Sequence, residues 1–385
     1  MARILYAIGG EGRGHAARVL AMTETLRARG HEVTFAGGGQ ARAFLDAHGE
    51  TVLAVPALRQ VLDGNRLRLT RTALANASTV LGARRLVAKL ARQLERIAPD
   101  LVVSDFEAFV PRAAARVGIP VVSFNNQEVL TEGIYRLPER LRASAALAET
   151  AVRAIAPPAP THRIVTALTA LPLRHPARTT LVGPILRRAV REAVPHGGAH
   201  LVAYFNVERR LDPILRALEG TGVPVHLYGV GAEGMRGNLT FRPFSNEAFL
   251  EDLATCRGVV TTAGFTLLSE SLFLGKPVLA LPNGSVFEQT FNARLLEDIG
   301  AGHAVHDRSL NASDVRRFLD AYDGRPVGHA PVMAPGHEMA SRVLECYATV
   351  PATAPIRVSS LAEVPSLSGL VPAAVQYFAR RSAQL

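Results

Sequence analysis

The stretch that decides the fold spans residues 261–302 and reads TTAGFTLLSESLFLGKPVLALPNGSVFEQTFNARLLEDIGAG. An apolar, strand-like run over 258–264 leads into a helical pattern over 266–274, and a second apolar run, KPVLALP, follows over 276–282. Short apolar runs that alternate with helical patterns are typical of a parallel sheet covered by helices. Because a glutamate and a lysine interrupt the apolar residues, the stretch does not predict a membrane span.

The same alternation recurs on both sides of this stretch and predicts further strands. In the first half of the chain the candidate strands are ARILYAIG (2–9), HEVTFAG (31–37), residues 51–55, PDLVVSD (99–105) and GIPVVSFNN (118–126). In the second half they are HLVAYF (200–205), VPVHLYG (223–229) and LTFRPF (239–244). Helical patterns lie between them, at residues 14–29, 108–117 and 247–256. The first helix is expected to end at Gly30, because glycine is favoured just beyond helix ends.

A chain of 385 residues favours two domains, since one hydrophobic core rarely serves so many residues. Polar segments rich in proline between positions 156 and 195 mark the boundary. The fold class is therefore α/β, with two Rossmann-like, doubly wound parallel-sheet domains. The predicted parts are an N-terminal domain over 1–183, a linker over 184–194, a C-terminal domain over 195–350, and a tail over 351–385 with a terminal helix.

Composition indicates a soluble globular protein, with 48% hydrophobic and 20% charged residues. The two cysteines have no metal-binding spacing, so they predict neither a disulfide framework nor a zinc site. The short apolar run at the N-terminus breaks into glycines, unlike a secretory signal. We expect a cytoplasmic protein, with peripheral contact at the inner face of the membrane as an alternative.

The net charge of +10 is concentrated between residues 59 and 96. Two acidic residues, Asp63 and Glu95, accompany a set of basic residues there, namely Arg59, Arg66, Arg68, Arg71, Arg84, Arg85, Lys89, Arg92 and Arg96. This pattern predicts either a solvated helix face or a surface for an anionic lipid or an acidic acceptor. Nucleic acid is not an expected partner, because no nucleic-acid-binding motif accompanies the charge.

A glycine-rich loop, GGEGRGH over 9–15, follows the first predicted strand and opens the first helix. Glycines let a backbone turn tightly and approach a ligand closely, and those of this loop are Gly9, Gly10, Gly12 and Gly14. Their spacing does not match the dinucleotide pattern GxGxxG, and the second strand ends in FAGGG without an acidic residue. A Rossmann dehydrogenase is therefore disfavoured.

Two residues at strand ends are candidates for catalysis. His15 follows the glycine loop, and Asp105 ends the strand LVVSD, so both belong to the carboxyl edge of one parallel sheet, where ligands bind. Asp105 could fix the imidazole tautomer while His15 removes a proton from a hydroxyl group. The structural alternatives are a histidine that packs at the helix start and an aspartate that caps the following helix.

Residues 261–302 resemble the donor-binding signature of GT-B glycosyltransferases, which include plant and macrolide UDP-sugar transferases and the lipid II-forming N-acetylglucosaminyltransferase. The shared features are a glycine before threonine, a glutamate four residues on, GxPxxxxP, a Glu-Gln pair and NA-x-x-L. With GGEGRGHAAR, DFEAF, GIPVVSFNNQ and VGPILRR, the chain is most similar to the bacterial and archaeal UDP-glucuronosyltransferase-like or teichoic-acid-type branch. The resemblance covers residues 3 to about 310 and implies two Rossmann-like domains facing each other across a cleft.

The resemblance also implies how a nucleotide-sugar would bind. A strand-to-helix turn with free backbone N–H groups suits a diphosphate, and here it consists of Ala263, Gly264, Phe265 and Thr266. Glu270 matches the ribose-binding glutamate, since a carboxylate can accept hydrogen bonds from both ribose hydroxyls. Phe244 lies where relatives meet the nucleobase, with a core phenylalanine as the alternative. The donor-sugar residues of the family match Glu288, Gln289 and Asn292.

The implied activity is inverting transfer of a sugar from a nucleotide-sugar, a UDP-sugar by resemblance, to a hydroxyl acceptor. No DxD carboxylate pair occurs, so we expect neither a metal nor another cofactor. Relatives often carry two glycines where this chain has Ala263-Gly264, and the chain lacks the tryptophan of plant relatives. The alternatives are a nucleotide-sugar epimerase of the same fold, whose acidic-Ser-Gly-Gly turn is not visible here, and a nucleotide-sugar-binding protein without catalysis.

Overall fold

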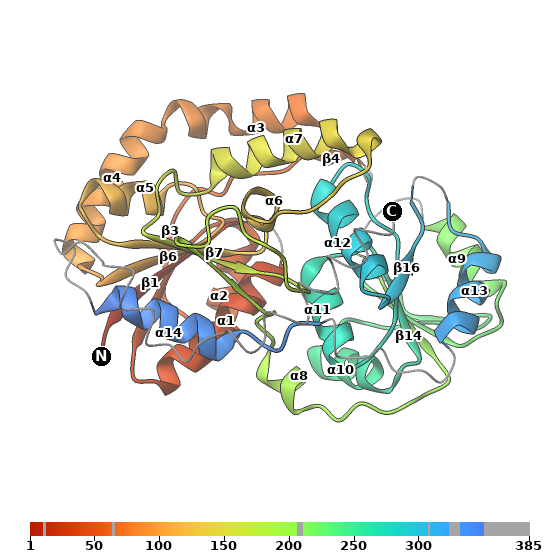
Figure 1. Cartoon of the computed structure of the whole chain (residues 1–385). Helices are drawn as coiled ribbons and strands as arrows, with labels where there is room; N and C mark the ends of the chain where they lie inside the picture. The colour runs from red at the N-terminus through yellow and green to blue at the C-terminus, as the bar shows by residue number, and fades with distance from the viewer. Residues whose placement is uncertain (11–12, 64–65, 206–210, 307–308, 323–331, 350–385) are drawn as a thin grey trace.

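The computed structural model describes residues 1–10, 13–63, 66–205, 211–306, 309–322 and 332–349. It contains two lobes, each built on a seven-stranded sheet, that lie side by side (Figure 1). The predicted Gly12 and the predicted tail over 351–385 lie outside the described residues. Among the helices of the described part, none is both long and apolar enough to cross a membrane.

The sheet of the first lobe is parallel throughout, in the order β3-β2-β1-β6-β7-β8-β9. Its strands are β1 (Arg3–Ile8), β2 (Glu32–Gly37), β3 (Val52–Ala54), β6 (Leu101–Asp105), β7 (Val121–Asn125), β8 (His162–Thr166) and β9 (Thr179–Val182). A short hairpin of β4 (Leu62–Asp63) and β5 (Arg66–Leu67) stands apart from this sheet. Strand order changes direction beside β1, which places the ends of β1 and β6 at a topological switch point where ligands bind in such sheets.

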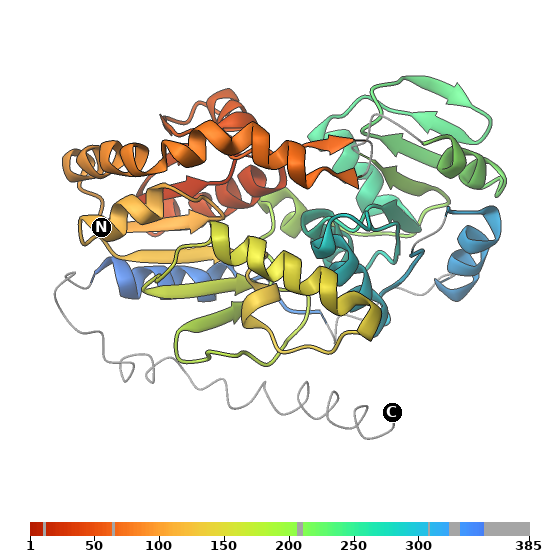
Figure 2. The ribbon, with the colours of Figure 1, turned by 90° about the horizontal axis from the view of Figure 1, so that it is seen from above.

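Helices cover both faces of this sheet. One face packs against α1 (Arg13–Ala28) and α2 (Gly39–Ala47), and the other packs against α4 (Ala83–Ile97) and α5 (Val110–Arg116). The remaining helices of this half of the chain are α3 (Leu69–Leu81), α6 (Val129–Glu132) and α7 (Glu139–Ile155). Seen from above, α7 runs across to the second lobe (Figure 2).

The sheet of the second lobe has the order β12-β13-β11-β10-β14-β15-β16, with only β12 antiparallel. Its strands are β10 (Leu201–Tyr204), β11 (Val225–Tyr228), β12 (Gly234–Arg236), β13 (Leu239–Phe241), β14 (Gly258–Thr261), β15 (Val278–Ala280) and β16 (Gly302–Ala304). One face packs against α10 (Asn246–Thr255), α11 (Phe265–Phe273) and α12 (Phe287–Asp298), and the other against α9 (Asp212–Glu219) and α13 (Ala312–Tyr322).

The last described helix, α14 (His337–Ala348), belongs to the core of the first lobe (Figure 1). Val343 and Leu344 pack there with residues of β1 and α1, although the sequence assigned 195–350 to the C-terminal domain. The chain thus crosses between the lobes twice, and the crossings touch where the Gly336 N–H donates to the Pro184 carbonyl at 3.0 Å. A Cβ atom on Gly183 would overlap the Ala334 carbonyl oxygen, so glycine permits this contact.

Most predicted elements are present at nearly the predicted bounds. All ten predicted strands are found, and α1 is followed by Gly30 with a φ of 85°. The proline-rich region before the linker, in which the sequence predicted no strand, contains β8 and β9, which complete the first sheet. The predicted linker, 184–194, contains the short helix α8 (Arg188–Glu192), whose Val190 packs in the core of the second lobe.

Two buried histidines hold α14 in place. The ring of His162 stacks on that of Tyr347 at 5.1 Å, and the Tyr347 hydroxyl lies 3.0 Å from His162 Nδ1. His337 Nε2 lies 2.9 Å from the Leu186 carbonyl oxygen. Burial, helped by nearby arginines, lowers the pKa of each histidine to about 4, so both are neutral near pH 7.

Acid should therefore loosen α14. In the unfolded chain these histidines protonate near pH 6.5, whereas in the folded chain they do so only near pH 4. Stability is fully present above pH 6.5 and is lost as the pH falls toward 4, by up to about 1.4 kcal/mol per pKa unit. We expect Tm, followed by circular dichroism from pH 7.5 to 4.5, to fall less steeply in His162→Gln. The exposed control His48→Gln should keep the wild-type slope, and equal slopes in all three proteins would contradict the assignment.

Candidate functional site

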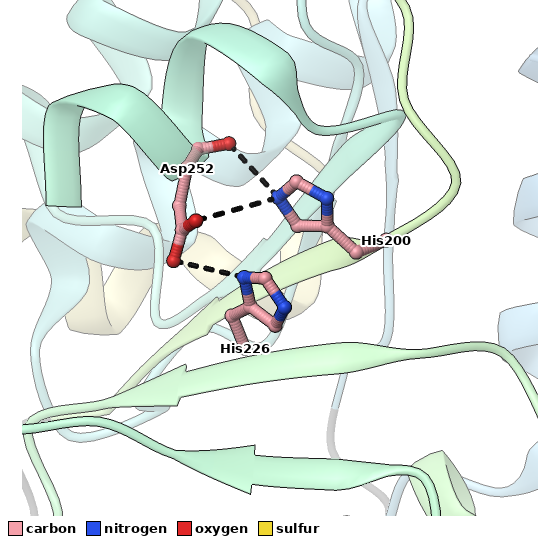
Figure 3. Close-up of side chains that lie close together, drawn as sticks. All are labelled: His200, His226 and Asp252. Carbon is pink, nitrogen blue, oxygen red and sulfur yellow. Dashed lines mark hydrogen bonds and ion pairs between the residues drawn. The ribbon is translucent and has the colours of Figure 1, made fainter. Parts of the chain in front are cut away.

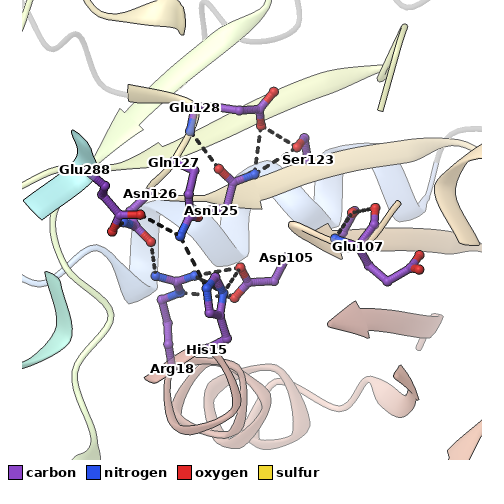
Figure 4. A network of polar contacts seen from close by, with 11 residues as sticks. His15, Arg18, Asp105, Glu107, Ser123, Asn125, Asn126, Gln127, Glu128 and Glu288 are labelled. Carbon is purple, nitrogen blue, oxygen red and sulfur yellow. Dashed lines mark hydrogen bonds and ion pairs between the residues drawn. The ribbon is translucent and has the colours of Figure 1, made fainter. Parts of the chain in front are cut away.

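The predicted pair His15 and Asp105 is formed in the structure. Asp105 is opposite Ile8 on the adjacent strand β1, and α1 begins a few residues after β1 ends, so His15 is carried to the end of β6. His15 Nδ1 lies 2.8 Å from Asp105 Oδ1 (Figure 4). Asp105 is fully buried, while 18% of the His15 side chain is exposed. This geometry allows Nδ1–H to donate to the carboxylate and leaves Nε2 as a proton acceptor.

Arg18, one turn further along α1, binds the same carboxylate. Its NH2 group donates to both oxygens of Asp105, at 2.6 and 2.7 Å, and the arginine side chain is only 5% exposed. Burial by itself would raise the pKa of Asp105, but Arg18 and His15 together hold it below its usual value. Asp105 is therefore a fixed negative charge. Arg18 is the last residue of the motif GGEGRGHAAR, but the sequence did not predict a role for it.

A chain of contacts joins His15 to the second lobe. Gln127 Nε2 lies 3.3 Å from His15 Nε2 and donates to Glu288 Oε2 at 3.2 Å, and Asn126 Nδ2 donates to Glu288 Oε1 at 2.7 Å (Figure 4). Glu288 lies in the first turn of α12, so it faces the dyad from the opposite lobe. The buried Gln127 Oε1 has no hydrogen-bond partner among the described residues, so it is available to a hydroxyl donor.

The predicted diphosphate turn stands at the start of α11, directly opposite the start of α1. Gly264 is the N-cap and offers no side-chain cap, and the first turn of α11 contains no acidic residue. Ala263 has a φ of 66°, a left-handed conformation that glycine adopts more easily. A Cβ atom on Gly14 would lie 2.8 Å from Thr266 Oγ1, so two helix N-termini meet across the junction. Their positive ends together favour an anion.

Glu270, the predicted ribose ligand, is 3% exposed and already has a partner. Arg187, from the crossing between the lobes, donates to both of its oxygens at 2.8 Å. A carboxylate offers about four acceptor positions, so two remain for ribose hydroxyls. Arg187 belongs to the motif VGPILRR, but the sequence did not predict a role for it.

The two other predicted donor-sugar residues bind backbone groups. Asn292 is 2% exposed and its Nδ2 donates to the Ala263 carbonyl at 3.1 Å, which supports the diphosphate turn. Gln289 Oε1 accepts from the Asn283 N–H at 2.9 Å and orders the loop before α12. The structure thus places both beside the turn and its neighbouring loop, and their contact with a sugar stays a prediction.

Phe244 follows β13 and is 45% exposed. Its ring contacts Phe249 and Tyr204, with centroids 5.6 and 6.1 Å away. An aromatic surface open to solvent can contact a nucleobase, whereas a core phenylalanine would be covered.

The first two glycines of the predicted loop serve the packing of the chain itself. A Cβ atom on Gly9 would lie 2.8 Å from the Phe106 carbonyl oxygen, and one on Gly10 would overlap Ala57. Glu107, close in sequence to Asp105, accepts from the Phe109 and Val110 N–H groups at the start of α5. Burial raises the pKa of Glu107 to about 7, but its carboxylate is turned toward that helix.

Comparisons with known proteins agree on one family. A family model described as glycosyl transferase family 1 matches residues 2–322. An uncharacterised glycosyltransferase of Methanosarcina acetivorans is 26% identical over 330 residues, which cover 79% of this chain and 85% of the relative. The crystal structure of the glycotransferase of kitacinnamycin has a TM-score of 0.62 at 17% identity, covering 90% and 98% of the two chains. Arabidopsis thaliana UGT89C1, complexed with UDP, has a TM-score of 0.60 at 15% identity, covering 90% and 100%.

Proposed function

Since the chain belongs to glycosyl transferase family 1 and is a glycosyltransferase of the GT-B fold, we propose that it transfers a sugar from a UDP-sugar to a hydroxyl acceptor. The observation that carries this proposal is the His15–Asp105 pair, 2.8 Å apart and linked through Gln127 to Glu288 of the opposite lobe. A general base from one lobe thereby faces the donor-binding sequence of the other. The UDP complex of a structural neighbour supports uridine as the nucleoside.

On the donor side, the starts of α1 and α11 supply the electrostatics. Backbone N–H groups around Gly264 and Thr266 bind the diphosphate, Glu270 binds the ribose, and Phe244 contacts the uracil ring. Glu288 and Gln289 bind hydroxyls of the donor sugar, while Asn292 supports the turn. Fixed N–H dipoles stabilise the charge that develops on a leaving group at little reorganisation cost.

On the acceptor side, His15 Nε2 takes the proton of the attacking hydroxyl while Asp105 stabilises the imidazolium. The acceptor oxygen forms a bond to the anomeric carbon, the bond from that carbon to the diphosphate oxygen breaks, and UDP leaves with the electron pair. A single displacement of this kind inverts the anomeric configuration. Gln127, which occupies His15 Nε2 in the structure, marks the position that the acceptor hydroxyl takes.

Catalysis in this scheme needs no metal ion, because N–H groups and helix ends take the place of a divalent cation at the diphosphate. The proposed function is tested with a panel of nucleotide-sugars, measured by thermal shift and by release of UDP. A ligand at about 100 times its Kd stabilises a protein by about 2.7 kcal/mol, so the true donor should stand out. Release of UDP should persist in the presence of EDTA. Conversion of the donor into an epimer, with no release of UDP, would replace transfer by epimerisation.

Glu288→Ala should weaken the binding of the intact UDP-sugar by about tenfold and leave the binding of UDP itself nearly unchanged. The reason is that a hydrogen bond to a charged group is worth about 1.5 to 3 kcal/mol, and Glu288 is assigned to the sugar alone. Calorimetry with UDP and with the donor found in the panel separates the two affinities. Glu297→Ala, at the far end of the same helix, is the matched control. A parallel loss of UDP affinity in Glu288→Ala would contradict its assignment.

We also propose that the basic region between residues 59 and 96 contacts an anionic lipid surface. The lipid-facing surface consists of α3 and α4, where Leu74, Val80 and Leu81 are 76%, 59% and 87% exposed. Exposed basic residues accompany them, namely Arg71, Arg84, Arg85, Lys89 and Arg92. Apolar side chains beside cationic ones are what an interfacial helix presents to a membrane.

Vesicle flotation tests this surface. Binding should require anionic lipid, should fall as salt is raised because exposed charges are screened, and should weaken about tenfold or more in Leu74→Ser/Leu81→Ser. Leu147→Ser, which changes an exposed leucine of α7, is the matched control. If the protein does not float with vesicles, or floats equally with neutral and anionic vesicles, the proposal is wrong and α3 and α4 present an ordinary solvated face.

A further inference from the structure

A group of side chains in the second lobe is not used by the proposed reaction. Val202 of β10 is opposite His226 of β11, and His200 precedes Val202 by two residues, so both histidines lie on one face of the sheet. Helix α10 packs on that face and brings Asp252 to them (Figure 3). Two imidazoles and a carboxylate from three separate elements thus converge.

The distances within this group are those of potential metal ligands. His226 Nδ1 lies 2.9 Å from Asp252 Oδ2, and His200 Nε2 lies 4.0 Å from Asp252 Oδ1. One ligand atom from each residue lies within 4.8 Å of the others, the only such group among the described residues. The imidazole rings are stacked with centroids 4.2 Å apart, and the nitrogens that face Asp252 point to the same side (Figure 3).

The contact of His226 with Asp252 is short, yet it is not a hydrogen bond. His226 Nδ1 is buried and has no hydrogen-bond partner within the described part of the chain. A ring nitrogen and a carboxylate oxygen that approach this closely outside hydrogen-bond geometry are placed so that both can bind one cation. His200 Nε2 also forms a hydrogen bond with the Asp252 carbonyl oxygen at 3.1 Å. A bound ion requires the other tautomer of His200, in which the proton is on Nδ1 and the Nε2 lone pair is free to bind the ion.

We propose that His200 Nε2, His226 Nδ1 and the carboxylate of Asp252 bind one divalent transition-metal ion of the zinc class. Two imidazoles and one carboxylate are ligands that Zn²⁺, Co²⁺ and Ni²⁺ accept, and water completes the coordination. The Tyr228 hydroxyl donates to Asp252 and orients the carboxylate.

Arg242 is a charged neighbour that would compete with a metal ion for Asp252, and this competition provides a further test. Arg242 Nε lies 3.4 Å from Asp252 Oδ2 and supplies the counter-charge in the metal-free protein. Its side chain is 36% exposed, so it can move outward when an ion binds. Replacement of Arg242 by a neutral residue removes a competitor and no ligand, so Arg242→Gln should bind the ion more tightly.

The experiment uses the untagged full-length protein after dialysis against a chelator. Titration with Zn²⁺ by calorimetry should show one ion per chain, and Co²⁺ should give the visible absorption of a low-coordinate site. His200→Ala and His226→Ala should each weaken binding at least tenfold, whereas Arg242→Gln should strengthen it about threefold or more. His306→Gln, which removes a histidine paired with the single carboxylate of Glu297, should leave the affinity unchanged.

Each outcome is decisive. Absence of saturable binding, or binding that the two alanine variants do not alter, would overturn the proposal. If the alanine variants fail to fold, Arg242→Gln still tests it, because unchanged or weaker binding there would contradict competition at Asp252. Transfer activity is not the readout, so failure of this proposal leaves the proposed reaction untouched.

Discussion

Replacement of His15 by alanine should lower turnover by about a hundredfold to ten-thousandfold, the usual contribution of a positioned general base. Affinity for UDP should hardly change, because backbone N–H groups, Glu270 and Phe244 are assigned to the nucleotide and the His15 side chain is not. The hydroxyl of the acceptor would lose the only imidazole within reach of Asp105 among the described residues. Steady-state release of UDP gives kcat, and calorimetry gives the nucleotide affinity of the same preparation.

The matched control is His48→Ala, which removes an exposed histidine of the same lobe and should keep wild-type turnover. Asp105→Asn should also lose much of the rate, because an amide can favour the wrong imidazole tautomer. It also deprives the buried Arg18 of its counter-charge, so the folded fraction must be measured alongside. The double variant should be little slower than His15→Ala, since residues that act as a unit are not additive. Near-wild-type turnover in folded His15→Ala would remove histidine from the mechanism.

Replacement of Glu270 by alanine should weaken UDP binding by tenfold or more. Two hydrogen bonds from ribose hydroxyls to a buried carboxylate are lost, each worth about 1.5 to 3 kcal/mol. Calorimetry of UDP binding to the folded variant measures the effect. Loss of the carboxylate also leaves Arg187 unpaired, so a lower Tm is expected in addition.

Two further variants separate ribose binding from the ion pair. Arg187→Ala should lower Tm but retain most of the UDP affinity, because Glu270 keeps its acceptor oxygens. Glu251→Ala, which removes an exposed glutamate of α10, should change neither quantity. If Arg187→Ala and Glu270→Ala lose UDP affinity equally, Glu270 acts by positioning the crossing segment and not by binding the ribose.

The dyad could be predicted from the sequence because its geometry follows from strand order alone. Asp105 ends one buried strand and His15 follows another, and the carboxyl ends of neighbouring parallel strands meet at one edge. The partners Arg18, Asn126 and Gln127 could not be assigned in this way. Each is one polar residue among several near a strand or helix end, and only the tertiary structure shows which of them points toward Asp105 or Glu288.

Elements whose partners are distant in sequence were harder to place. The apolar face of α14 predicts burial but not the lobe that buries it, and the structure places Leu344 in the first core. The strand β9 is the edge strand of its sheet and β8 lies next to it, and both carry polar residues such as Arg163 and Thr180, so their apolar pattern is weak. The roles of Asn292 and Gln289 toward backbone groups likewise depend on loop geometry that no local pattern encodes.

The two crossings at Pro184 and Gly336 make the second lobe an insertion within the first, with both ends joined by one backbone hydrogen bond. An inserted domain of this kind can be exchanged as a unit, because a segment whose two ends lie together can be replaced without altering the path of the host chain. Donor and acceptor preference could then be recombined between relatives by grafting one continuous piece of sequence. A graft that omits residues 337–348 from the host would fail for a structural reason, since it would expose the part of the host's own core that α14 covers beside α1.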